Sequence, residues 1–135
     1  MSERPEPAAA VSVWLVKAGN DLKTAEHTLT LSDPDCPLDT VCFHAQQCAE
    51  KSLKAFLASK GIPFEKTHDL GQLLYQCRFD SGLIRDLKGL DEMTHYAVDV
   101  RYADVPPEQI TRSEAVLSVA LARRAYETVR HQLHL

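Results

Sequence analysis

Long stretches of helical periodicity, separated by short breaks, constrain the fold of this chain more than any other feature. Apolar residues recur at steps of three and four along residues 8–31, 38–60, 68–77, 83–102 and 107–133. This spacing gathers them on one face of an α-helix, and no convincing β-strand alternation appears. Short loops between long amphipathic helices predict an all-α fold, a five-helix antiparallel up-and-down bundle.

The breaks between these stretches carry specific signals for helix ends. Residues 32–39, "SDPDCPLD", hold two prolines and three aspartates and therefore predict a turn. Gly61 suits the left-handed residue after a helix, and Pro63 prevents its continuation. Thr67 is the expected N-cap of the third helix, with Asp69 in its first turn. We expect residues 1–7 to form a flexible tail and residues 8–135 to form one domain.

Composition narrows the class of protein. The chain has 135 residues, a hydrophobic fraction of 44% and a net charge of −4. A negative net charge argues against a broad basic surface that would bind nucleic acid. No apolar run is long enough to span a membrane, and the N-terminal residues lack the pattern of a secretion signal. These observations favour a cytoplasmic protein with no membrane partner.

The four cysteines are expected to be reduced thiols packed in the core. They occur at Cys36, Cys42, Cys48 and Cys77, and no C-x-x-C spacing is present. Cys42 and Cys48 are six residues apart on one helix and therefore point in different directions. The pattern does not favour a metal site.

A helical wheel divides the helix over 38–60 into two expected faces. One arc is rich in small residues and is the expected core face: Val41, Cys42, Ala45, Ala49, Ser52, Leu53 and Phe56. The opposite arc holds Gln47, Glu50, Lys51 and Lys54, which we interpret as the solvated face. Gln46 lies at the edge of the apolar arc, beside Leu53 and Leu57. It is either an ordinary boundary residue or a polar contact at a subunit interface or cleft.

In the last helix, the apolar periodicity predicts the residues that face the core. They are Ile110, Leu117, Leu121, Ala125 and Val129.

Three segments of the sequence carry motifs in a particular order. Residues 45–74, "AQQCAEKSLKAFLASKGIPFEKTHDLGQLL", are similar to the A-Q-Q-A-x-E-K-x-x-K-A run, glycine and H-D-L of the HEPN domain family. Residues 18–29, "AGNDLKTAEHTL", resemble its first helix. Residues 100–104, "VRYAD", resemble its R-Y-P-D, with Ala103 in place of proline. The motifs follow the family's order over nearly the whole chain.

This resemblance implies a HEPN-like five-helix up-and-down bundle, usually a homodimer. We expect no cofactor. Members are often encoded beside a minimal nucleotidyltransferase and pair with it, in some cases as a toxin–antitoxin pair, and nucleotide binding has been proposed for the family. We therefore expect a non-catalytic module that binds a nucleotide, a partner nucleotidyltransferase, or both. The alternative is a metal-independent ribonuclease of the family's toxin branch.

The ribonuclease alternative requires an arginine followed, after four to six residues, by a histidine. Such a pair could steady a phosphate and move a ribose hydroxyl proton. Arg101, in the family's own motif, has no histidine at those spacings. Arg124 and His131 fit the spacing, but a chain with eight arginines and six histidines gives about one such match by chance. They are the candidate catalytic pair only under this alternative.

Candidate residues for binding a nucleotide or a partner are Arg101, Tyr102, His68, Asp69 and Gln46. Arg101 continues an apolar stripe and needs an acidic partner or a bound anion. His68 and Asp69 form either a ligand site at a helix entrance, beside free backbone N–H groups, or a structural cap.

Two tyrosines could in addition stack on a base or act as boundary packing. They are Tyr96 and Tyr102. His44 is interpreted as a surface or boundary residue.

Overall fold

All regular structure within the described residues is helical. The computed structural model describes residues 7–64, 66–94, 96 and 109–135. Its elements are α1 (Pro7–Leu29), α2 (Leu38–Ser59), α3 (Leu70–Gln76), α4 (Ser81–Asp86), a 3₁₀ helix η1 (Leu90–Met93) and α6 (Arg112–Gln132). The prediction of an all-α fold with five helices is confirmed. No described helix is long and apolar enough to cross a membrane.

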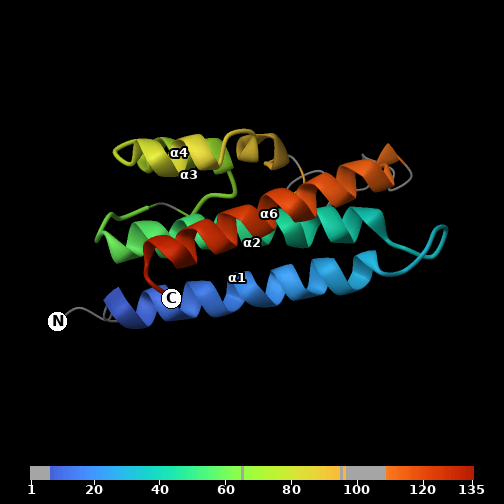
Figure 1. Ribbon diagram of the computed structural model, residues 1–135, viewed down its shortest axis with the longest axis horizontal. Helices are drawn as coiled ribbons and strands as arrows, with labels where there is room; N and C mark the ends of the chain where they lie inside the picture. The colour runs from blue at the N-terminus through green and yellow to red at the C-terminus, as the bar shows by residue number, and fades with distance from the viewer. Residues whose placement is uncertain (1–6, 65, 95, 97–108) are drawn as a thin grey trace.

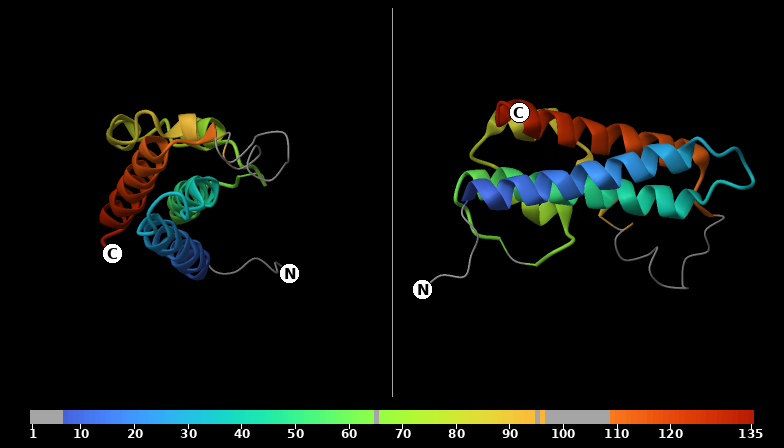
Figure 2. Two further views of the ribbon diagram at one scale, coloured as in Figure 1. Left: turned by 90° about the vertical axis from the view of Figure 1, so that its right-hand side faces the viewer. Right: turned by 90° about the horizontal axis from the view of Figure 1, so that it is seen from below.

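The helix α2 lies at the centre of the bundle. Helices α1 and α6 pack along it. Helices α3 and α4 form a short layer on the side of α2 and α6 that is opposite to α1 (Figure 1). Helices α2 and α6 both run antiparallel to α1, so the start of α1 and the end of α6 lie at the same end of the molecule (Figures 1 and 2). Because neighbours surround α2, most of its residues from Val41 to Leu57 are buried.

The core face expected for α2 is confirmed. Every member of the small-residue arc is buried, and Cys36, Cys48 and Cys77 are buried as well. All four cysteines are free thiols. Burial raises the pKa of Cys42 to about 11 and that of Cys48 to about 12, because a thiolate is disfavoured away from water.

The expected solvated face of α2 is wrong. Gln47, Glu50 and Lys54 are only 6%, 3% and 5% exposed, and Lys51 is half-buried. A wheel with one apolar arc describes a helix at the surface of a bundle. Helix α2 is instead central, so its polar side is covered as well as its apolar side.

The observed helix ends match those expected from the sequence in part. Gly61 has the expected positive φ of 68°, and the Ile62 N–H bonds the Leu57 carbonyl at 3.0 Å. The N-cap of α3 is Asp69, not Thr67: the Asp69 carboxylate accepts from the Gln72 N–H at 3.2 Å. Thr67 instead accepts from the Asp69 N–H at 3.0 Å.

The expected continuous helix over 83–102 is also wrong in its described part up to Thr94, and most of the remainder lies outside the described residues. Helix α4 begins earlier, at Ser81, and ends at Asp86. Gly89 then adopts a left-handed conformation with φ of 91°, before η1. A left-handed residue cannot continue a right-handed helix, so the chain turns there.

The last helix begins at Arg112 rather than near Pro107. Thr111 is its N-cap, accepting from the Glu114 N–H at 3.1 Å. Ile110, Ala125 and Val129 are buried as expected, but Leu117 is 56% exposed. The buried stripe of α6 includes Ala115, Val119 and Ala122 instead, and Leu117 does not lie on it.

Candidate functional site

A buried polar cluster connects α2 to the loop before α3. Its centre is the Glu50 carboxylate, which is 3% exposed. One oxygen, Oε1, lies 2.7 Å from His68 Nδ1, and the other, Oε2, accepts from Lys54 Nζ at 3.0 Å. Of the three side chains only His68 reaches solvent, with 44% of its side chain exposed. The cluster therefore presents one oriented imidazole at the surface.

Gln46 ties the cluster to the backbone of the loop. It is fully buried, and its Nε2 donates to the His68 carbonyl at 3.0 Å and lies 3.4 Å from Glu50 Oε1. Its Oε1 accepts from Gln47 Nε2 at 2.6 Å. All of these partners belong to the same chain, so the polar contact of Gln46 is an internal hydrogen bond.

Lys54 is buried among aromatic rings as well as paired with Glu50. Its ammonium lies 5.2 Å from the centre of the Trp14 ring and 5.9 Å from that of Phe64. The two rings meet edge to face with centroids 6.0 Å apart. Cation–π attraction supplements the ion pair here, because the ring faces carry negative charge density.

His68 and Asp69 have distinct roles in the loop. Asp69 caps α3, while backbone N–H groups at the start of that helix are already bonded: that of Asp69 to Thr67, that of Leu70 to the Thr94 hydroxyl and that of Gln72 to Asp69. The helix entrance therefore offers few free amides to a ligand. Since the Glu50 carboxylate can only accept, His68 Nδ1 donates to it, and Nε2 is left for another contact.

A second polar group lies between α1 and α2. The Asp21 carboxylate contacts His44 Nδ1 at 2.9 Å and accepts from Lys51 Nζ at 2.6 Å. Asp21 is largely buried and both partners are half-buried. His44 is a boundary residue, as expected, and its pairing with Asp21 shows in addition that polar contacts of residues 18–29 help to hold α1 against α2.

The remaining candidates that the structure describes are not part of this cluster. Arg101 and Tyr102 lie outside the described residues. Arg124 and His131 are both on α6 and exposed. Tyr96 is 6% exposed and its hydroxyl donates to Glu114 at 2.9 Å, so its ring is packed rather than available for stacking. Within the described part of the chain, no group of His, Cys, Asp and Glu could hold a metal ion.

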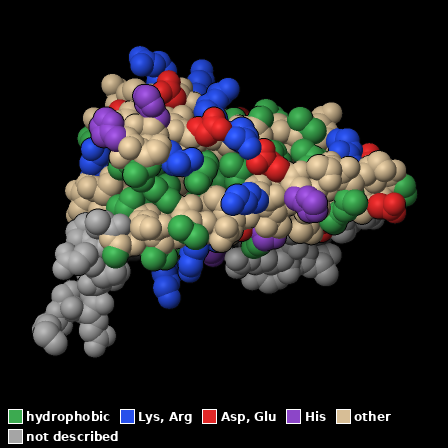
Figure 3. Space-filling model, turned by 60° about the horizontal axis from the view of Figure 1, so that its bottom comes forward, with side chains coloured by type: hydrophobic (Ala, Val, Ile, Leu, Met, Phe, Trp, Pro, Cys, Tyr) green, Lys and Arg blue, Asp and Glu red, His purple; other side chains and the backbone are tan. Residues whose placement is uncertain are grey.

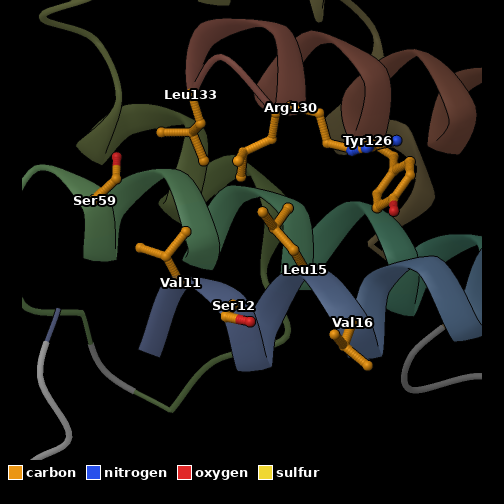
Figure 4. Close-up of a pocket in the computed structure, with 9 residues that line it drawn as sticks. Val11, Ser12, Leu15, Val16, Ser59, Tyr126, Arg130 and Leu133 are labelled. Atoms are coloured by element: carbon orange, nitrogen blue, oxygen red, sulfur yellow. The ribbon is translucent and has the colours of Figure 1, made fainter. Parts of the chain in front are cut away.

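An aliphatic groove separates the start of α1 from the end of α6. It has a volume of about 650 Å³. Val11 and Leu15 of α1 face Tyr126 and Arg130 of α6, and Leu133 directly after α6, across the groove (Figure 4). On the face shown in Figure 3, hydrophobic side chains gather in a hollow with Lys and Arg side chains around it. The lining of this groove is mostly apolar, although an arginine, a tyrosine and two serines also reach it.

Comparison with known proteins identifies the class. Residues 11–132 match the HEPN domain family, and the chain therefore belongs to the HEPN family. Its structure is similar to the crystal structure of TT1696 from Thermus thermophilus, with a TM-score of 0.71 and 25% identity over 90% of this chain and 96% of that chain. It is also similar to ST0689, an archaeal HEPN homologue, with a TM-score of 0.67 and 28% identity over the same shares. No curated protein matches the chain.

Proposed function

We propose that this HEPN protein is a non-catalytic module that binds a nucleotide at the surface around His68. The observation that carries the proposal is the position of His68 at the exposed end of an otherwise buried cluster. A buried ion pair often stabilises a fold no better than apolar residues of similar size. The Glu50–Lys54 pair is therefore better explained as orienting the imidazole than as strengthening the core.

The oriented imidazole suits an oxygen-rich ligand. With Nδ1–H donated to Glu50, Nε2 is left for the ligand. It accepts from a ribose hydroxyl when the imidazole is neutral, and it donates to a phosphate oxygen when both ring nitrogens carry a proton. Lys66 lies two residues earlier, is exposed, and adds a positive charge to the same loop. A phosphate near the loop would therefore meet both a directional hydrogen-bonding group and a cation.

Calorimetric titration with ATP and GTP tests the proposal. Wild type is expected to bind at least one of them, and His68→Ala to bind about tenfold more weakly or worse, because a hydrogen bond to a charged group is lost. His131→Ala is the matched control, since His131 is another exposed histidine and lies on α6, outside the buried cluster. Absence of binding by wild type, or equal binding by both variants, would refute this function.

The homodimer and the pairing with a minimal nucleotidyltransferase, suggested by the family's members, belong to the same proposal. Light scattering measures the mass of the purified protein, and we expect twice the mass of one chain. Co-expression with a nucleotidyltransferase encoded next to this chain, followed by purification, tests the pairing. A monomer that never co-purifies with such a protein would contradict both expectations.

The ribonuclease alternative gains no support from the geometry. Arg124 and His131 lie exposed on α6, and no described acidic residue positions the imidazole of His131. We expect the chain to leave labelled RNA intact. Cleavage that is abolished in His131→Ala but kept in His68→Ala would establish the alternative instead.

A further inference from the structure

A hollow beside α3 has the size and lining of a small ligand site. It lies between the loop that follows α2 and one face of α3, and its volume is about 450 Å³. That volume is within the range typical of small-molecule sites. The hollow is lined by Pro63, Phe64, Gln72, Tyr75 and Gln76. Two aromatic rings and two side-chain amides therefore surround one cavity.

Tyr75 provides a platform for stacking. It is 64% exposed, and the Arg78 guanidinium lies over its ring at 3.9 Å from the centroid. Arg78 Nη1 also donates to the Tyr75 carbonyl at 2.9 Å, which holds the guanidinium in place. An exposed tyrosine supported in this way is the type of group on which nucleobases stack.

The two glutamines provide hydrogen-bonding groups of a specific kind. Gln76 Nε2 donates to the Pro63 carbonyl at 3.0 Å and is thereby fixed. The Gln72 amide makes no hydrogen bond to another described side chain or backbone group. A free amide offers a donor and an acceptor side by side. That pair matches the N6 and N7 edge of adenine, which presents one donor and one acceptor. The corresponding N7 and O6 edge of guanine presents two acceptors.

The hollow is adjacent to the buried cluster. Phe64, one of its walls, lies over the Lys54 ammonium, and Lys54 pairs with Glu50, the partner of His68. Lys54 and Glu50 are four residues apart on α2. This separation is roughly one helical turn, or 5–6 Å along the helix axis. The wall of the hollow and the imidazole thus contact successive turns of α2.

We propose that this hollow receives the adenine base of the bound nucleotide, with Tyr75 stacking on the base and Gln72 bonding its edge. The inference rests on the proposed function, in which His68 contacts the phosphate or ribose of the same ligand. It assigns the base specificity of the site to residues outside the family's motif, since Gln72 and Tyr75 both follow the H-D-L.

Titrations with AMP, GMP and inorganic triphosphate separate the two ends of the ligand. AMP is expected to bind wild type more tightly than GMP. Tyr75→Ala is expected to weaken AMP about tenfold, and Tyr75→Phe to leave it unchanged, because stacking requires only the ring. Gln72→Leu should remove the preference for AMP over GMP. Both changes should leave triphosphate binding as in wild type, whereas His68→Ala should weaken it.

Phe79→Ala is the matched control for Tyr75→Ala. Phe79 is 55% exposed and close in sequence, but it does not line the hollow, so its loss should not change AMP binding. If nucleotides bind and respond to His68→Ala but not to Tyr75→Ala or to the identity of the base, the adenine site is refuted and nucleotide binding survives. If wild type binds neither nucleotide nor triphosphate, both proposals fail.

Discussion

Neutralising Glu50 should destabilise the fold far more than neutralising a surface carboxylate. In Glu50→Gln the Lys54 ammonium, whose side chain is 7% exposed, would lose its carboxylate while remaining buried. Removing one member of a buried pair costs about 3–5 kcal/mol, because the other charge is left uncompensated. The Trp14 and Phe64 rings still face the ammonium, so we expect a loss near the lower limit, about 3 kcal/mol. That is a large fraction of the roughly 5–15 kcal/mol typical of a domain.

Urea unfolding at neutral pH measures this loss. Glu127→Gln is the matched control: Glu127 pairs with Arg123 at 2.6 Å, also four residues apart, but both are exposed. Its effect should stay within about 0.5 kcal/mol. Adding Lys54→Met to Glu50→Gln should recover part of the loss, because the buried charge is then removed. The reasoning is refuted if Glu50→Gln is as mild as Glu127→Gln, or if the double variant is less stable than the sum of the two single changes predicts.

Two further predictions concern packing and pH. A Cβ at Gly19 would lie 2.9 Å from the Tyr126 hydroxyl oxygen. Gly19→Ala should therefore be more favourable by about 1 kcal/mol in a Tyr126→Phe background than in wild type, and equal effects in urea unfolding of the two backgrounds would show that no clash exists. Burial raises the pKa of Cys48 from 9.0 to about 12, so the unfolded chain loses this thiol proton at a lower pH than the folded chain. The stability that the buried neutral thiol confers is therefore complete below pH 9 and is lost as pH rises from 9 to 12. At pH 10 wild type should have lost roughly 1 kcal/mol through this thiol that Cys48→Ala does not lose. A stability difference between the two proteins that does not change from pH 7 to pH 10 would contradict this prediction.

The sequence was sufficient for the fold because helical periodicity and helix ends are local signals. The periodicity of α1 and α2 and the cap at Gly61 each depend on residues within a few turns of one another. Helix α4 was less predictable, since the left-handed turn at Gly89 interrupts an apolar stripe that continues on both sides. A periodic pattern cannot reveal such a break when a glycine is also tolerated within helices.

The residues of the candidate site are predictable from the sequence only in part, and their arrangement is not. The sequence points to Gln46, His68 and Asp69, yet its helical periodicity assigns Glu50 and Lys54 to solvent. The error arises because a helical wheel shows which residues share a face and not how many neighbours the helix has. The charged residues of α2 become interpretable only once the loop before α3 and the rings of Trp14 and Phe64 are placed against them.

The most direct test of this account is the nitrogen NMR spectrum of the His68 imidazole during titration with ATP. Glu50 should hold the ring with its proton on Nδ1 before and after addition, while the Nε2 signal shifts as the ligand binds. His44, which is similarly paired with Asp21 at 2.9 Å, provides an internal reference that should not move. A His68 spectrum that resembles a free imidazole, or an Nε2 signal that saturating ATP leaves unchanged, would contradict the proposed role of the buried cluster.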